Sequence, residues 1–262
     1  MFSFFKKKKP LIQESIAKEV EDYTDIRIIA TYFKNETGVT FEHQMSILEN
    51  KVLTFCKLRA ISSFKKLRTS IEHDTKLKQE LVDLLTTNET FFYRELRQIM
   101  EFVTLAQHHS GDIKILCAPC ATGEEPYSLA IALLEAGVSA KSFSIVGIDI
   151  NADALQKAQE AKYRERNVRN LNAEIISKYF KKNDKKHENL YILSDEIKSL
   201  VTFKLINLFD PSFASLGKFD FIFSRNMLIY FDKETKLKAK NILDNMRQDT
   251  KYPVFFGHAD LF

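Results

Sequence analysis

The apolar residues of this chain follow two different periods. From residue 24 to about residue 110 they recur every three or four positions, as on one face of an α-helix. Three sets show this most clearly: Ile28, Ile29, Tyr32 and Phe33; Ile47, Leu48, Val52, Phe55 and Cys56; and Leu77, Leu81, Leu84 and Leu85. Gly38 closes the first of these patterns, as a glycine after a helix commonly does. We therefore predict an all-helical N-terminal part.

After Gly111 and Asp112, short apolar runs alternate with helical patterns. The alternation predicts strands at 113–118, 143–149, 219–223 and 252–257, and helices at 125–136, 151–162 and 232–248. Strands that alternate with helices favour a parallel sheet covered on both faces. The predicted fold class is α/β, with a doubly wound, mainly parallel sheet.

One segment departs from the alternation. After a polar loop at 181–189, residues 190–193 and 200–206 have the pattern of two short strands. They could form a small antiparallel β insert, at about 180–206, whose edge pairs with an extended peptide. A plain connecting meander explains the pattern equally well.

The first predicted strand ends at a turn with the chemistry of a ligand site. Gly123 lies in this turn, and a helical pattern begins at once. Such a turn at the carboxyl edge of a sheet commonly binds a phosphate. Here Glu124 and Glu125 would repel one and would favour a ligand with positive charge and hydroxyls. S-adenosylmethionine has a sulfonium, an amino group and a ribose. A generic turn whose acids favour the helix dipole is the alternative.

Three further segments place polar residues after predicted strands. Asp149 ends the second strand, 26 positions after Gly123, where a carboxylate can accept both ribose hydroxyls. Asn207, followed by Leu208, could read a base edge through its amide and backbone. Arg225 and Asn226 follow the buried run from Phe219, again at a carboxyl end.

The segment from Asn88 to Glu95 lies between the helical part and the sheet. It places three aromatic residues beside Arg94, and aromatic faces suit a sulfonium cation. A helix cap followed by core aromatics would also explain the segment.

Composition and charge narrow the function classes. The chain has 262 residues, 45% of them apolar, which is enough for one large α/β domain and a smaller one. A net charge of +4 gives no sign of nucleic-acid binding. Residues 51–68 contain six basic residues and no acid, which suits an acidic partner or a solvated helix face. These six are Lys51, Lys57, Arg59, Lys65, Lys66 and Arg68.

The cysteines and the lengths of the apolar runs argue against a zinc protein and a membrane-spanning protein. Cys117 and Cys120 form a C-x-x-C with no second pair or His cluster to complete a zinc site, so we predict packing residues and no metal. With Cys56 the count is odd, which fits a reducing cytoplasm. No apolar run reaches the roughly 18 residues of a membrane span. Residues 1–10 lack the order of a signal peptide and are interpreted as a charged tail, or as a weak contact with a membrane surface.

Taken in order and spacing, the segments resemble the bacterial chemotaxis receptor protein-glutamate O-methyltransferases, the CheR family. The resemblance runs from about Thr37 to Ala259 and rests on four motifs. Asn88-x-Thr90 with Arg94-Glu95 is similar to N-x-T-x-F-F-R-E, and residues 121–128 to A/C-S-T-G-E-E-P-Y-S. Asp149 matches the second-strand motif, and residues 224–231 are similar to C-R-N-V-L-I-Y-F.

The resemblance implies a class I methyltransferase that uses S-adenosylmethionine to esterify glutamates of chemoreceptors. It implies a tail at 1–23, a helical receptor-docking domain at 24–87 that carries the six basic residues, and a methyltransferase domain at 88–262. Arg94 and Tyr230 would face the methyl group as catalytic residues. The implied cofactor contacts are Asn88, Thr90, Arg94, Glu125, Asp149, Asn207, Leu208, Arg225 and Asn226. We expect a cytoplasmic monomer, recruited to membrane-bound receptor arrays, with no membrane insertion and no nucleic-acid partner.

The chain departs from the family pattern in three places. Phe92-Tyr93-Arg94 replaces F-F-R. No glycine occurs between Gly147 and Gly217, so the glycine-containing loop that grips a receptor's C-terminal peptide is not expected. The sequence ends soon after Gly257-His-Ala-Asp260, which resembles G-H-S-E, so the last antiparallel strand is expected to be missing or formed differently.

Two other functions stay open. A nucleic-acid methyltransferase would need polar, proline-rich residues to seat a flipped base, and residues 224–230 do not provide them. A non-catalytic module that binds the cofactor or a receptor array is the second alternative.

Overall fold

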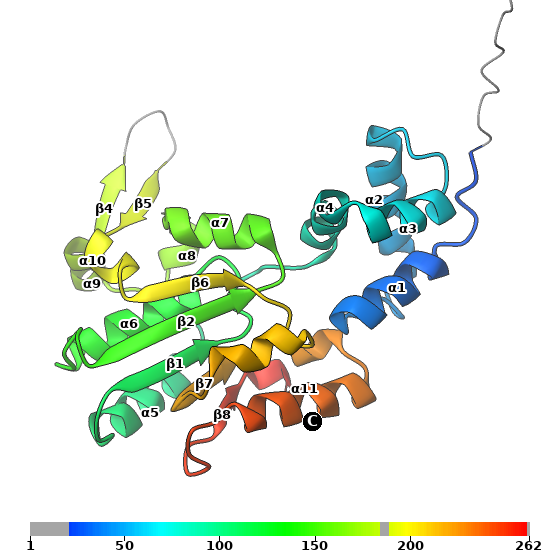
Figure 1. The fold of residues 1–262 in the computed structure, drawn as a ribbon. Helices are drawn as coiled ribbons and strands as arrows, with labels where there is room; N and C mark the ends of the chain where they lie inside the picture. Colours follow the sequence, from blue (N-terminus) through cyan, green and yellow to red (C-terminus); the bar gives the residue numbers. More distant parts are fainter. Residues whose placement is uncertain (1–20, 184–188, 261–262) are drawn as a thin grey trace, which may run out of the picture.

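The computed structural model describes residues 21–183 and 189–260 (Figure 1). The predictions made for the tail and for part of the polar loop therefore lie outside the described residues.

A five-stranded sheet forms the centre of the molecule, in the order β6-β2-β1-β7-β8 (Figure 1). All four pairings are parallel, which confirms the predicted fold class. The chain runs from the central β1 outward to β2 and β6, and then returns to add β7 and β8 on the other side. The strands are β1 (Ile113–Cys117), β2 (Phe143–Asp149), β6 (Val201–Leu205), β7 (Phe221–Ser224) and β8 (Val254–Phe256).

Helices cover both faces of this sheet because successive strand residues point to opposite sides. On β1, Ile115 and Cys117 belong to the core under α5 (Leu96–Gln107) and α6 (Glu124–Glu135). Leu116 belongs to a second core, under α11 (Lys233–Asn245). Residues Glu124 to Leu133 of α6 are buried throughout. The two cores fix the sheet, and with it the edge where its strands end.

Four helices form a separate bundle with its own core: α1 (Arg27–Thr37), α2 (Met45–Leu58), α3 (Phe64–His73) and α4 (Thr75–Leu85). Ser63 caps α3 and Asp74 caps α4 through hydrogen bonds to backbone N–H groups. Gly38 ends α1 with φ of 78°, as predicted. A Cβ there would lie 2.6 Å from the ring of Phe209, so only glycine lets α1 come this close to the sheet domain.

The small antiparallel sheet differs from the predicted insert. It consists of β3 (Lys162–Arg164), β5 (Leu190–Leu193) and β4 (Phe180–Asn183), in that order. The prediction that 200–206 belongs to it was wrong, because Val201–Leu205 pairs in parallel with β2. Helix α10 (Asp195–Lys198) turns the chain back toward the main sheet, and Phe203 packs edge-on against Tyr127 at 5.5 Å. The packing of Phe203 against this core favours the main sheet.

The remaining described elements are short. They are α7 (Ala152–Glu160), α8 (Glu165–Val168), α9 (Ala173–Tyr179), η2 (Pro211–Leu216), η3 (Leu228–Tyr230) and η4 (His258–Asp260). Cys56, Cys117 and Cys120 are buried free thiols, as expected of packing residues. Among the described residues no helix has both the length and the apolar character of a membrane span.

Candidate functional site

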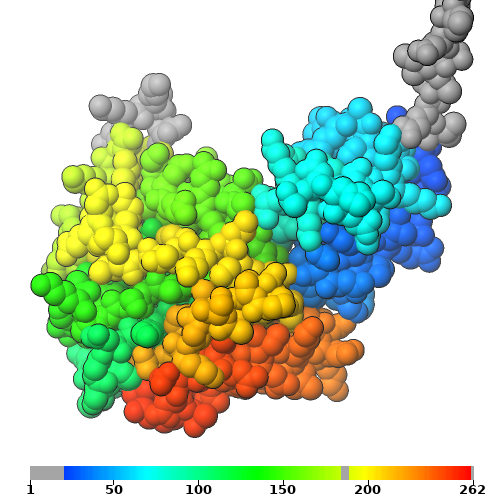
Figure 2. All heavy atoms as spheres, viewed as in Figure 1, coloured from blue at the N-terminus to red at the C-terminus, as the bar shows by residue number. Residues whose placement is uncertain are grey.

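A cavity of about 230 Å³ lies at the carboxyl edge of the sheet, where the helical bundle meets the strands. In an open parallel sheet this edge, next to the point where strand order reverses, is the usual ligand site. The bundle contributes one wall, through the end of α1, the following loop and the start of α2. The other wall comes from the ends of β1, β2 and β7 and the loop after β6. Figure 2 shows the bundle, blue to cyan, standing against the sheet domain.

The structure brings six of the ten predicted cofactor and catalytic residues into this cavity wall. They are Asn88, Asp149, Asn207, Leu208, Asn226 and Tyr230. Thr90, Arg94, Glu125 and Arg225 do not line the cavity. The bundle residues of the wall, such as Thr40, Phe41 and His43, were not predicted. No motif marks them, since they reach the site only by docking of the two parts.

Asp149 is held by the turns on either side of it. Its Oδ2 accepts the N–H of Ala121 at 2.8 Å and its Oδ1 accepts the N–H of Asn151 at 2.9 Å. Ala121 has φ of 46°, a left-handed conformation that costs a non-glycine residue energy. Burial raises the pKa of Asp149 to about 6, although these hydrogen bonds oppose the shift. Each carboxylate oxygen retains a lone pair for a hydroxyl donor.

The turn after Asp149 is also fixed by α4 of the bundle. Asp83 Oδ1 accepts the N–H of Ala152 at 2.7 Å. Asn151 donates to the carbonyl of Asp83 at 3.1 Å and to Thr86 Oγ1 at 2.7 Å. Gln79 donates to the carbonyl of Ile150 at 2.8 Å. The bundle thus positions the loop that carries Asp149.

Two further contacts join the bundle to the cavity. The amide of Asn207 donates to the carbonyl of Glu36 at 2.6 Å, and its Oδ1 accepts the N–H of Phe209 at 2.9 Å. The side chain that was predicted to read a base edge is therefore already engaged. Thr40 donates its N–H to the carbonyl of Tyr230 at 2.9 Å. This hydrogen bond anchors the backbone of Tyr230, a residue that lines the cavity.

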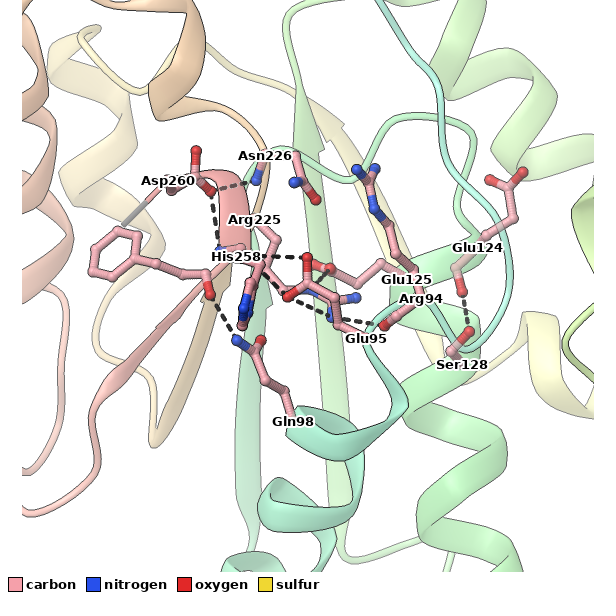
Figure 3. A network of polar contacts seen from close by, with 12 residues as sticks. Arg94, Glu95, Gln98, Glu124, Glu125, Ser128, Arg225, Asn226, His258 and Asp260 are labelled. Carbon is pink, nitrogen blue, oxygen red and sulfur yellow. Dashed lines mark hydrogen bonds and ion pairs between the residues drawn. The ribbon is translucent and has the colours of Figure 1, made fainter. Parts of the chain in front are cut away.

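Arg225 and Glu125 form a buried ion pair beside the cavity (Figure 3). Arg225 Nε donates to Glu125 Oε2 at 2.5 Å, and its Nη1 donates to the carbonyl of Arg94 at 2.8 Å. Glu125 Oε1 is buried and has no hydrogen-bond partner among the described residues. A buried acceptor without a donor is costly and suits a ligand with an N–H or O–H group.

Arg94 occupies an unusual backbone position. Tyr93 and Glu95 on either side have φ of 54° and 53°, both left-handed. Strain of this kind concentrates at functional sites. In Figure 3 the Arg94 guanidinium points away from the Arg225–Glu125 pair. Its Nη1 donates to the carbonyl of Glu89 at 3.1 Å, next to the cavity residue Asn88.

Glu124, the other acid of the turn, supports the segment around Thr90. It is fully buried, and burial raises its pKa. Its carboxylate accepts from Thr122 at 2.6 Å and from Asn167 at 2.7 Å. Asn167 also donates to the carbonyl of Thr90 at 3.4 Å. Glu124 is thus fully occupied with protein partners.

Asp260, the last residue of the Gly257-His-Ala-Asp260 motif, supports the loop of the cavity residue Asn226. It is buried, and its carboxylate accepts the N–H groups of Asn226, Ile229 and Gly257, the last at 3.0 Å. Asn226 has φ of 59°, so its loop needs such support. Asp260 corresponds to the final acid of the G-H-S-E motif, and this match is the sequence feature that could have indicated its role.

The six basic residues of 51–68 do not form one free surface. Arg59 pairs with Glu80 at 2.7 Å and Arg68 with Glu72 at 2.6 Å. Lys51 donates to the carbonyl of Leu84 at 3.2 Å and lines the cavity. Lys57, Lys65 and Lys66 are exposed. Residues 51–68 contain no acid themselves, but Glu72 and Glu80 lie next to them in the folded protein.

The donor set fits a ligand with hydroxyl, amine and aromatic groups. Asp149 offers a carboxylate, Asn88 and Asn226 offer amides, and Leu208 and Phe231 offer apolar walls. In the part of the chain described, no group of three His, Cys, Asp or Glu side chains could hold a metal ion.

Comparison with known proteins identifies this arrangement. Residues 88–262 match the family model "CheR methyltransferase, SAM binding domain". A chemotaxis protein methyltransferase of Campylobacter jejuni is 36% identical over 225 residues, which cover 86% of this chain and 84% of the relative. One of Salmonella typhimurium is 29% identical over 240 residues, covering 90% and 83%.

Among solved structures, a magnesium protoporphyrin IX methyltransferase from Synechocystis with bound S-adenosylhomocysteine matches with a TM-score of 0.33 and 16% identity. The match covers 67% of this chain and 57% of that one. A score this low supports no inference about function. The chain belongs to the CheR methyltransferase family, and residues 88–262 form its S-adenosylmethionine-binding domain.

Proposed function

We propose that this protein transfers a methyl group from S-adenosylmethionine to glutamate side chains of chemoreceptors, giving glutamate methyl esters. The observation that carries the proposal is the cavity shared by the bundle and the sheet, with Asp149, Asn88, Asn226 and Tyr230 in one wall. The family is that of chemotaxis methyltransferases, and a receptor carboxylate is the substrate that this membership favours.

The residues would hold the cofactor through complementary groups. Asp149 would accept the ribose hydroxyls, as a carboxylate at the end of a second strand does in nucleotide sites. Glu125 Oε1, buried without a donor, would accept from the amino group. Leu208 and Phe231 would pack on the base. When bound, the cofactor supplies a methyl group activated by a sulfonium.

The protein would have little acid–base work to do. A glutamate with a pKa near 4.3 is already a carboxylate at neutral pH, so no general base is needed. Arg94 would orient this carboxylate, and the Tyr230 hydroxyl would donate a hydrogen bond to it. The positive sulfonium and the negative carboxylate neutralise each other along the reaction. Methyl transfer should therefore be faster in an apolar site without water than in aqueous solution. Alignment of the reacting groups would contribute the larger share.

The test is incubation of the protein with methyl-labelled S-adenosylmethionine and receptor-containing membranes, followed by alkali. A carboxyl methyl ester releases labelled methanol, whereas an N-methyl group does not. Label on the receptor that is stable to alkali would exclude a glutamate methyl ester, and label that enters nucleic acid would replace this proposal with the nucleic-acid alternative. Cofactor binding without transfer would support a non-catalytic module.

The basic residues support a docking role for the bundle only in part. Lys57 and Lys65 remain exposed on α2 and α3 and could face an acidic receptor surface. Arg59 and Arg68 are neutralised by their ion pairs. The cytoplasm, next to receptor arrays, is the place this function requires.

A further inference from the structure

Three arginines around α8 form a basic surface that the sequence pattern did not suggest. Arg164, Arg166 and Arg169 are exposed. Within residues 21–183 and 189–260, no carboxylate forms an ion pair with any of them. This contrasts with residues 51–68, where acids neutralise Arg59 and Arg68. We call these three residues the α8 arginines.

The α8 arginines adjoin the segment that carries Arg94. The guanidinium of Arg169 lies 3.8 Å from the ring centre of Phe91, and that of Arg94 lies 5.6 Å from the same ring. Two guanidinium groups thus share one aromatic side chain. A guanidinium so close to a ring is held by a cation–π contact.

Backbone contacts hold α8 against this segment. Asn167 accepts the N–H of Phe92 at 2.8 Å through its carbonyl and donates to the carbonyl of Thr90 at 3.4 Å. Its amide also donates to the buried carboxylate of Glu124 at 2.7 Å. Asn167 lies between Arg166 and Arg169 in the chain, so the α8 arginines are fixed relative to Arg94.

We infer that the α8 arginines bind acidic side chains of the protein substrate that flank the glutamate presented to Arg94. The inference rests on the proposed function and extends it to the choice of substrate. A segment with several carboxylates would meet the guanidinium groups of Arg94 and Arg169, which lie near the ring of Phe91, and then the exposed Arg166. Arginine suits this role because it stays charged and presents several donors to carboxylates. A glutamate without acidic neighbours would be methylated more slowly.

The experiment measures receptor methylation rates and S-adenosylhomocysteine affinity for Arg166→Glu, Arg169→Glu and the double variant. At low salt we expect the double variant to methylate receptor membranes about tenfold more slowly, with unchanged affinity for S-adenosylhomocysteine. The deficit should shrink as salt is raised, because exposed charges are screened. Lys141→Glu is the matched control, since Lys141 is exposed before the amino end of β2, at the opposite edge of the sheet.

Arg169→Lys separates charge from packing. It keeps the positive charge but loses the planar group on Phe91 and the forked donors, so we expect a rate between those of the wild type and of Arg169→Glu. A wild-type rate in the double variant, or a loss no larger than that of Lys141→Glu, would overturn this inference but leave the proposed function standing. So would an equal loss of cofactor affinity. If the wild-type protein itself transfers no methyl group to receptors, the proposed function is wrong, and the inference falls with it.

Discussion

The side-chain amide of Asn151 donates to the main-chain carbonyl of Asp83 at 3.1 Å and thereby joins the loop after β2 to the last turn of α4. Asn151 is 1% exposed, so its end of this contact is buried, while Asp83 is partly exposed. The bundle and the sheet therefore share one polar contact region next to Asp149, the proposed acceptor of the ribose hydroxyls. The cavity depends on how the bundle is docked.

Removal of the Asp83 carboxylate should loosen this loop. Asp83→Ala leaves the N–H of Ala152 without its acceptor, which typically costs about 1–3 kcal/mol. We expect S-adenosylhomocysteine affinity to fall about three- to tenfold in calorimetry, since Asp149 loses its fixed position. Asp83→Asn keeps an oxygen acceptor and serves as the control. Equal affinity in the alanine variant would show that the loop holds its shape without α4.

Cofactor binding should weaken below about pH 6. Burial raises the pKa of Asp149 to about 6, so the carboxyl carries a proton below that pH and can no longer accept from both ribose hydroxyls. The affinity for S-adenosylhomocysteine should be constant above pH 7. Below pH 6 it should fall by up to about tenfold per pH unit, because one carboxylate takes up one proton. Asp149→Asn should bind weakly with no such pH dependence between 5 and 7. A wild-type affinity that is constant over this range would exclude Asp149 as the ribose acceptor.

The two arginines of the site should behave differently on substitution. Arg94→Ala removes a partly exposed guanidinium but leaves the Arg94 carbonyl for Arg225, so the fold should persist. We expect the methylation rate to drop by about a hundredfold or more, with cofactor affinity changed much less. Rates and binding constants measured on the same preparation decide this. Parallel loss of both would assign Arg94 to cofactor binding rather than to the substrate.

Arg225→Met should destabilise the fold itself. The substitution leaves the Glu125 carboxylate buried beside an apolar group, and loss of one partner of a buried pair costs about 3–5 kcal/mol. Urea unfolding measures the change. The double variant Arg225→Met/Glu125→Gln should recover part of this loss, because no buried charge remains. A double variant as unstable as the single one would mean that Arg225 stabilises through the Arg94 carbonyl instead.

The sequence by itself determined the elements and the class of fold. Strand β1 is a nearly continuous apolar run because both of its faces are buried, and Gly38 ends α1 because a side chain would not fit there. The motif residues at strand ends, such as Asp149 and Asn226, reach the cavity since parallel strands end at one edge.

Only the tertiary structure decided which polar groups remain available. Asn207 is engaged by Glu36, Arg225 by Glu125, and Arg59 by Glu80. Each of these partners is distant in sequence, so no local pattern reports the contact. Strand β6 joined the main sheet for the same kind of reason, because Phe203 packs on Tyr127 of α6. Hydrogen bonds and burial between distant segments are properties of the packed chain, whereas periodicity reports only which face of an element is apolar.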